Sequence, residues 1–200
     1  MSGYFTTDPH EMELRFSNEQ SFAFMESLFS EPTEEALATI AMVRDVLDFI
    51  PQWEADLIEM FFFTQMRQTD IGHVFKVSQP TVCYRLQRAA TRIHFLLNVV
   101  HVTEEEMVED FKPLTTDPFD LDVLLNMFRT TCQSETAEEL GSTQSMVRHR
   151  FLSLLNRISS YPEIESKYRK TMELIRDNSN ILRDVSRKTK EGAITYMILP

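Results

Sequence analysis

Cysteine, glycine and alternating β-branched residues are all scarce in this sequence. The 200-residue chain contains 2 cysteines and 4 glycines. Because Cys83 and Cys132 are isolated from each other, no disulfide framework or zinc site is predicted, and a reducing cytoplasm fits them. Valine and isoleucine seldom alternate with polar residues, so the strand signal is poor and we predict an all-α fold.

Long apolar runs and catalytic motifs are also missing. No stretch is long enough to cross a bilayer, and the amino terminus lacks the features of a secretion signal. None of the 5 histidines has a partner at metal-ligand spacing. The chain has no glycine-rich phosphate loop and no serine nucleophile flanked by glycines. We therefore predict a protein with no membrane partner, no cofactor, no metal and no enzymatic activity.

The chain does contain a large excess of acidic residues, and this excess is unevenly distributed. Its net charge is −11, while residues 1–65, 66–102, 103–143 and 144–200 carry −11, +4, −9 and +5. Exposed charges act over roughly 10 Å at moderate salt, so a phosphate responds to the local charge. The overall acidity is therefore compatible with DNA binding, although it predicts weak non-specific affinity and leaves acidic surfaces for another partner.

The stretch Gln68–Ile93 has the pattern of two helices joined by a tight turn at Lys76-Val77. Thr69 is predicted to cap the first helix and Ser78 the second, since their hydroxyls can accept free backbone N–H groups. Pro80 falls within the first turn of the second helix, where proline is tolerated. The buried side of the first helix is predicted to carry Ile71, Val74 and Phe75.

The second of these helices has two distinct faces. Apolar residues at steps of three and four predict a buried face of Val82, Leu86, Ala89 and Ile93. The opposite face is polar and basic, which suits a DNA major groove. It carries Gln79, Thr81, Tyr84, Arg85, Arg88 and Arg92. The alternative is a purely structural role, because similar helix pairs occur in many all-α cores that never touch DNA.

The region from about Ile50 to Leu97 resembles region four of bacterial sigma factors, the helix-turn-helix portion that reads the upstream promoter element. The resemblance rests on Pro51, Leu57, Phe62, Thr69–Gly72, Val77–Val82, Arg85-Leu86, Arg88-Ala89 and Ile93, of which Ser78–Val82 is the most specific part. It implies that Gln79, Thr81, Tyr84, Arg85 and Arg88 face the groove or its phosphates.

Two departures from the sigma pattern are visible. Phe75-Lys76 stands where the family usually has Leu-Gly, although Phe can fill the same buried position. Residues 1–50 are too short and too acidic for the domain that opens promoter DNA in complete sigma factors. We therefore expect a protein that does not melt promoters by itself.

A second copy of the pattern occurs at Ser134–Ile158, after an apolar support helix predicted at Leu121–Arg129. A shift of 65 residues aligns the copies without a gap, pairing Gly72 with Ala137, Lys76 with Gly141 and Arg85 with Arg150. Its outward residues are predicted to be Gln144, Ser145, Arg148, His149 and Arg150. Chance similarity between two amphipathic helix pairs is the competing explanation.

Two interpretations of the repeat stay open at this point. Both copies could bind successive major grooves, which lie about 34 Å apart along one face of the duplex. Alternatively, one copy binds DNA and the other is a degenerate packing partner. The chain is accordingly expected to be either a monomer with two pseudo-repeats or a homodimer.

The remaining segments complete five predicted regions. These are an acidic helical segment at 1–50, a first helix-turn-helix unit at 51–102, an acidic linker at 103–117, a second unit at 118–160, and a basic helix with a short extended tail at 161–200. Within them, residues 1–17 are predicted to be irregular, and Thr33 and Thr103 to begin helices. The run Phe61–Phe63 cannot share one helix face, so at least one ring should contact a neighbour.

Together these patterns predict a cytoplasmic, nucleoid-associated transcription regulator that binds double-stranded DNA in a sequence-specific manner. Its recognition helices would be Gln79–Leu96 and Gln144–Ser159, with RNA polymerase as a second candidate partner for the acidic surfaces. The rival hypothesis is a protein-interaction module that binds polymerase, or imitates a sigma domain, without reading DNA.

Overall fold

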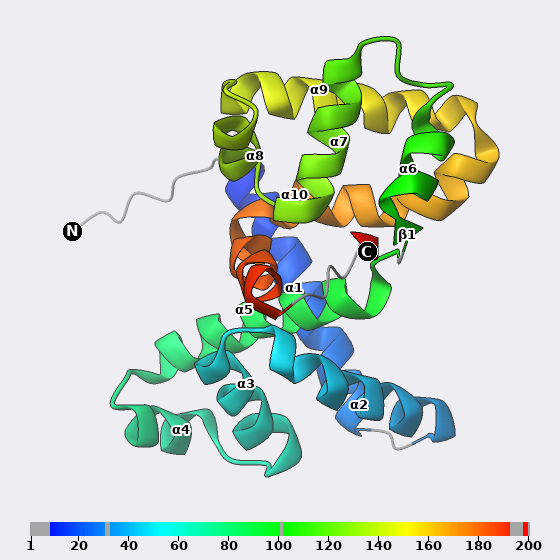
Figure 1. Ribbon diagram of the computed structural model, residues 1–200. Helices are drawn as coiled ribbons and strands as arrows, with labels where there is room; N and C mark the ends of the chain where they lie inside the picture. Colours follow the sequence, from blue (N-terminus) through cyan, green and yellow to red (C-terminus); the bar gives the residue numbers. More distant parts are fainter. Residues whose placement is uncertain (1–8, 31–32, 101, 193–197, 200) are drawn as a thin grey trace. The chain divides into compact units, whose positions relative to one another are not determined.

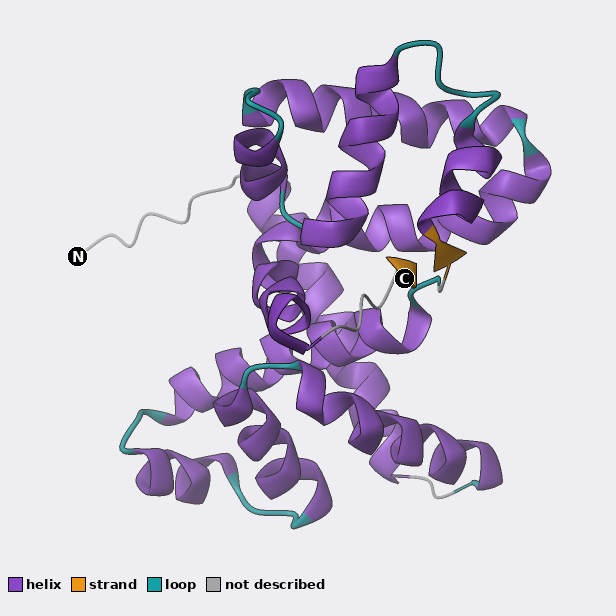
Figure 2. Ribbon diagram, viewed as in Figure 1, coloured by secondary structure: helices purple, strands orange, loops and turns teal. Residues whose placement is uncertain are grey.

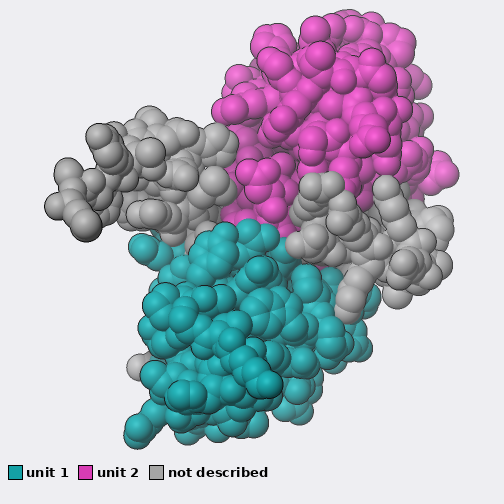
Figure 3. Space-filling model, turned by 90° about the vertical axis from the view of Figure 1, so that its left-hand side faces the viewer, with its two compact units in different colours: residues 1–94 teal, residues 95–200 magenta. Residues whose placement is uncertain are grey.

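The computed structural model describes residues 9–30, 33–100, 102–192 and 198–199, and the side chains of residues 19–30, 33–100 and 102–182. Helices dominate this part of the chain, as predicted, and Figure 2 shows two short strands beside them. The chain divides into two compact units, Met1–His94 and Phe95–Pro200, which Figure 3 shows in different colours. No helix among the described residues combines the length and apolar character needed to cross a bilayer.

Unit 1 is built from consecutive helices. In chain order these are α1 (Pro9–Ser30), α2 (Glu34–Val46), the 3₁₀ turn η1 (Leu47–Phe49), α3 (Gln52–Ile58), the π-helix η2 (Glu59–Phe63), α4 (Gln68–Phe75) and α5 (Gln79–Asn98), labelled in part in Figure 1. The last residues of α5 continue into unit 2.

The amino-terminal boundaries were predicted only in part. Helix α1 begins at Pro9, so the expectation that residues 9–17 are irregular was wrong. Residues 31 and 32, between α1 and α2, lie outside the described residues. Thr33 caps α2 as predicted, and its hydroxyl accepts a hydrogen bond from the Ala36 N–H at 3.1 Å.

The three consecutive phenylalanines pack unit 1 together. The π-helical turn η2 carries all of them, and each ring meets a neighbouring helix. Phe61 and Phe62 lie 6.0 and 5.8 Å from the ring of Phe22 on α1. Phe63 lies 5.0 Å from the ring of Phe29 on the same helix. The expectation that at least one ring contacts a neighbouring helix is therefore confirmed.

Unit 2 contains the remaining elements. They are β1 (Val102–Thr103), α6 (Glu104–Phe111), α7 (Pro118–Thr130), α8 (Gln133–Glu139), α9 (Gln144–Arg157), the 3₁₀ turn η3 (Ile158–Ser160), α10 (Pro162–Gly192) and β2 (Ile198–Leu199). The two short strands pair in parallel, with Val102 opposite Ile198. The predicted extended tail is thus present at its end, while residues 193–197 lie outside the described part.

Helix starts in unit 2 follow directly from the sequence. Thr103 and Glu106 form the capping box of α6, in which each side chain bonds the other residue's backbone N–H. Asp117 caps α7 by accepting a hydrogen bond from the Phe119 N–H at 3.0 Å. Pro118 then occupies the first helical position, where a missing N–H costs nothing.

Helix α10 is joined to α6 by a buried tyrosine and a lysine. The Tyr168 hydroxyl donates to Asp110 at 2.7 Å, and the Lys167 ammonium donates to the same carboxylate at 2.8 Å. Burial of Asp110 raises its pKa, but the bonds from Lys167 and Tyr168 outweigh this and hold the pKa below its ordinary value. The bond to Asp110 likewise raises the pKa of Lys167.

Three of the four described bases of α10 are paired with acids of the same chain. Arg169 pairs with Glu165 and Glu173, and Arg176 pairs with Asp177. With Lys167 held by Asp110, three described bases of this helix are engaged with acids of the same chain. The side chains of Arg183, Arg187, Lys188 and Lys190 lie outside the described residues.

Candidate nucleic-acid interface

The first helix pair consists of α4 and α5, joined by a tight turn at Lys76. Lys76 has left-handed backbone angles, φ 56° and ψ 40°, and the Val77 N–H donates to the Gly72 carbonyl at 2.9 Å. A Cβ on Gly72 would lie only 2.8 Å from the Val77 carbonyl oxygen. Glycine at position 72 therefore lets the turn fold back against α4.

The second helix pair, α8 and α9, has the same turn 65 residues later. Gly141 takes the left-handed conformation, with φ 58°, and the Ser142 N–H donates to the Ala137 carbonyl at 2.8 Å. The shift that aligns the two sequences thus also aligns the left-handed residue and the hydrogen bond across the turn. This agreement argues against chance similarity between the two stretches.

The second helices of the pairs begin at equivalent residues, Gln79 and Gln144. The Thr81 N–H donates to the Ser78 hydroxyl at 3.4 Å, in agreement with the predicted cap. The equivalent bond in the other pair, from the Met146 N–H to the Thr143 hydroxyl, measures 3.2 Å. The prediction that Thr69 caps this helix is wrong. Helix α4 begins at Gln68, so Thr69 lies within the helix, and the capping residue Arg67 makes no side-chain hydrogen bond to it.

The predicted buried face of α5 is confirmed, and α9 has its counterpart. In both copies the equivalent side chains are at most 1% exposed; they are Val82, Leu86, Ala89 and Ile93 in α5, and Val147, Phe151 and Leu154 in α9 with Ile158 in η3. Val74 was wrongly expected to be buried and is 56% exposed. His73 beside it is exposed as well, so this side of α4 faces solvent.

In each unit, a buried carboxylate binds two arginines of the second helix of the pair. This carboxylate lies on the helix that precedes the pair, α3 in unit 1 and α7 in unit 2. One oxygen of Glu54 binds Arg92 and the other lies 3.7 Å from Arg85. We call this group, in either unit, a carboxylate clamp. In unit 2 the clamp consists of Asp120, whose two oxygens lie 3.0 Å from Arg150 and 2.5 Å from Arg157.

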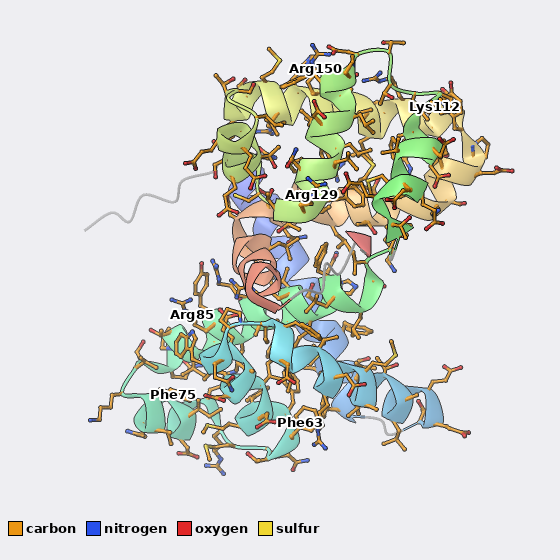
Figure 4. The ribbon with its side chains drawn as sticks, viewed as in Figure 1. Phe63, Phe75, Arg85, Lys112, Arg129 and Arg150 are labelled. Atoms are coloured by element: carbon orange, nitrogen blue, oxygen red, sulfur yellow. The ribbon has the colours of Figure 1, made fainter. Side chains whose placement is uncertain are left out.

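Each clamp also includes an aromatic ring from the residue before the carboxylate. The guanidinium of Arg85 lies 5.0 Å from the Trp53 ring centre, and that of Arg150 lies 5.8 Å from the Phe119 ring centre. Figure 4 labels both arginines. The repeat therefore includes α3 and α7, whose residues align with a shift of 66 positions. The first copy's extra residue falls in the loop before α4, after the left-handed Gln65 that corresponds to Thr131.

Three of the arginines predicted to face DNA belong to the clamps. Arg92 is fully buried against Glu54, so its prediction as an outward residue was wrong. Arg150 was also expected to face outward, but its side chain is 32% exposed and pairs with both Asp117 and Asp120 at 3.0 Å. Arg85 is in an intermediate situation, with a side chain 39% exposed and a single carboxylate at 3.7 Å.

The other predicted residues of α5 lie at its amino-terminal surface. Gln79 and Tyr84 are exposed, and Thr81 and Arg88 are half-buried. Gln79 donates to the Gln68 side chain at 2.6 Å, which ties the two helices of the pair together. Arg88 donates to the Tyr84 hydroxyl at 3.2 Å, with its guanidinium 5.7 Å from that ring. Arg88 has no carboxylate partner among the described residues.

The corresponding surface of α9 is exposed as well. Gln144, Ser145, Arg148 and His149 are all exposed, and Arg148 makes no ion pair within the described part of the chain. A shallow groove of about 480 Å³ continues along this side of the helix. It is lined by His149, Leu152, Ser153, Asn156, Arg157 and Ser160. No carboxylate contributes to this lining.

Acidic residues are excluded from both second helices. The chain contains 31 acidic residues in 200, yet none falls within α5 or within Gln144–Ser160. The first helices of the pairs differ sharply in this respect. Helix α4 carries one acid, Asp70, whereas α8 carries Glu135, Glu138 and Glu139. The surface around α5 is therefore more favourable for an anionic partner than that around α9.

The clamp carboxylates were not predicted from the sequence, although a signal for them exists. Glu54 stands in register with the apolar positions Leu57, Ile58 and Phe62, and Asp120 with Val123, Leu124 and Met127. An acid within an apolar helical stripe must be buried, and a buried carboxylate requires a partner such as arginine. This rule would have flagged both residues.

Comparison with known proteins adds no further evidence. No protein-family model matches the sequence, and no match was found among the curated proteins or the solved structures. Among the described residues, no cluster of His, Cys, Asp or Glu could hold a metal ion.

Proposed function

We propose that this protein is a sequence-specific DNA-binding transcription regulator whose main contact surface is the first helix pair. The observation that carries the proposal is the acid-free amino-terminal half of α5, in which Gln79 and Tyr84 are exposed and the half-buried Arg88 donates to the Tyr84 hydroxyl at 3.2 Å. Amide side chains and arginine are the groups that read base edges in the major groove, and arginine and tyrosine also contact phosphates. The resemblance to sigma region four supports the same role for this helix.

The second helix pair has a subordinate role in this proposal. Its framework matches the first, but the two carboxylates at Arg150 neutralise one of its cations and α8 adds three acids. Arg148 and His149 still offer a small basic surface. We therefore assign tight binding to the first pair, and a weaker contact or a packing role to the second.

The rival hypothesis is a module that binds RNA polymerase without reading DNA. The internal pairing of Arg92, Arg150 and Arg157 favours it, because cations already held by carboxylates are poor ligands for phosphates. Exposed acids on α2 and α8 would then form the contact. In the regulator proposal RNA polymerase is a second partner, and the protein acts in the cytoplasm at the nucleoid.

Binding to duplex DNA at several salt concentrations separates the two hypotheses. When Lys and Arg side chains bind phosphates, they displace the counterions that surround the DNA. The logarithm of the affinity therefore falls linearly with the logarithm of the salt concentration, with a slope of about −0.9 per phosphate neutralised. We expect a slope that corresponds to several contacts, and an enriched motif after selection from random duplex DNA. Binding without salt dependence, or a selection that enriches nothing, would contradict DNA recognition.

A further inference from the structure

Helix α2 of unit 1 has an exposed apolar patch with acidic residues at both ends. The patch consists of Leu37, Ala38, Ala41 and Met42, and we call it the α2 patch. Leu37 is 56% and Met42 is 51% exposed, although both are large apolar side chains. Leu37 with Ala41, and Ala38 with Met42, are spaced four residues apart, so these four side chains are neighbours on the helix surface.

The charges around the α2 patch are predominantly negative. Glu34 and Glu35 precede it and Asp45 follows it, and all three are exposed. Arg44 lies at the same end as Asp45, but its guanidinium rests 4.6 Å from the centre of the Phe63 ring. Glu34 and Asp45 are separated by about 16 Å along the axis, at 1.5 Å per residue.

Unit 2 shows how such an acidic helix is covered. Helix α6 starts like α2, with a threonine cap followed by glutamates, and its Met107 and Phe111 are fully buried. Helix α10 covers α6 by placing Lys167 between Glu106 and Asp110, at 3.2 and 2.8 Å. The Tyr168 ring then packs on Phe111. Apolar contact beside a lysine that bridges two carboxylates is thus the chemistry that this chain itself uses.

We propose that the α2 patch is the docking site for a helix of a partner protein that carries apolar side chains with Lys or Arg at each end. Charge complementarity selects this occupant. A second copy of the chain would instead place Glu34, Glu35 and Asp45 opposite the same residues, and like charges at such distances repel. The site is separate from the α5 surface and does not depend on DNA binding.

The test uses the full-length chain and two labelled helical peptides of about 16 residues, which is long enough to span the patch. Both peptides carry leucines on one face; one has lysines at each end, and its twin has glutamates there. Binding is measured by fluorescence anisotropy. We expect the basic peptide to bind at least tenfold tighter than the acidic one, and Leu37→Ser with Met42→Ser to weaken it at least tenfold.

A charge swap distinguishes the patch from the general acidity of the protein. The triple variant Glu34→Lys/Glu35→Lys/Asp45→Lys should prefer the acidic peptide. The control Asp122→Lys/Glu138→Lys/Glu163→Lys makes the same charge change at exposed acids of unit 2 and should leave the preference unchanged.

Equal effects of the two triple variants would overturn the proposal, as would failure of the basic peptide to bind. Sedimentation of the wild-type chain as a dimer that Leu37→Ser/Met42→Ser dissociates would also overturn it, because a second copy would then be the occupant. Circular dichroism of each variant establishes that the helices are retained.

Discussion

The first helix pair ends its initial helix with His73, Val74 and Lys76 exposed, whereas the second ends its initial helix with Glu138 and Glu139 exposed. Behind these surfaces the two pairs share their turn hydrogen bond, their left-handed residue, their buried helix face and their carboxylate clamp. The comparison shows which structural features the two pairs have in common. It also shows that the exposed charges can change while the framework stays constant.

The largest difference in stability between the two units is expected when the clamp carboxylates are removed. Glu54→Ala leaves Arg92, which is 0% exposed, without its carboxylate, and should lower the free energy of unfolding by about 3–5 kcal/mol. Asp120→Ala should cost less, about 1–2 kcal/mol, because the guanidiniums of Arg150 and Arg157 reach solvent. Urea denaturation measures both, with Glu59→Ala as the exposed control. Equal losses would show that the clamps are energetically equivalent.

A smaller difference in stability is expected for substitutions near the ends of α4 and α8, just before the turns. Gly72→Ala places a Cβ 2.8 Å from a backbone oxygen, which must move, and should cost about 1–3 kcal/mol. The equivalent Ala137 already carries a Cβ, so Ala137→Gly should cost only about 0.5–1 kcal/mol through helix propensity. Thermal unfolding of the two variants makes the comparison. A neutral Gly72→Ala would mean that the first turn is looser than its geometry indicates.

The left-handed residues of the two turns offer a reciprocal exchange. Lys76→Gly relieves a side chain in the left-handed region and should stabilise unit 1 by up to about 1 kcal/mol. Gly141→Lys introduces the same strain in unit 2 and should destabilise it by about 1 kcal/mol. Both values come from denaturation midpoints. If both exchanges were neutral, the backbone angles would carry no strain at either site.

Local periodicity predicted most of the framework. The threonine caps at Thr33 and Thr103, and the buried positions Val82 and Leu86, depend on residues only a few positions apart. The repeat was likewise visible, because the pairs Gln79 and Gln144, Val82 and Val147, and Arg85 and Arg150 keep the same spacing in both copies.

The positions of the arginines could not be predicted in the same way. Arg92 follows Arg88 by one helical turn and shares its side of a wheel, yet it is buried because Glu54, 38 residues earlier, lies opposite it. The second half of α5 is also buried on more than one side, at Ala90, Thr91 and Phe95. Such burial depends on which helices pack around α5, and a single helical pattern does not contain that information.

The smallest predicted effect concerns the contact between α6 and α10, which gives unit 2 a dependence on pH. Because the pKa of Asp110 is lower in the folded chain, its contribution to stability is present above the unfolded value, about 3.9, and is lost as pH falls below it. The raised pKa of Lys167 gives the opposite limit, with stability lost as pH rises above about 10.5. Asp110→Asn should flatten the acid limb of a denaturation–pH profile. An unchanged limb would place the acid sensitivity elsewhere.

The claim that the first helix pair is the principal DNA contact is tested most directly by comparing Arg88→Ala with Arg148→Ala on one duplex obtained by selection. Both variants remove an arginine from the outward face of a second helix. Lys112→Ala controls for the loss of a positive charge, because Lys112 belongs to neither helix pair and its side chain is 72% exposed. We predict that Arg88→Ala weakens binding by about 1–3 kcal/mol, measured by anisotropy at fixed salt, whereas Arg148→Ala has a smaller effect and Lys112→Ala none. A larger loss with Arg148→Ala, or equal affinities for all three variants, would contradict the assignment.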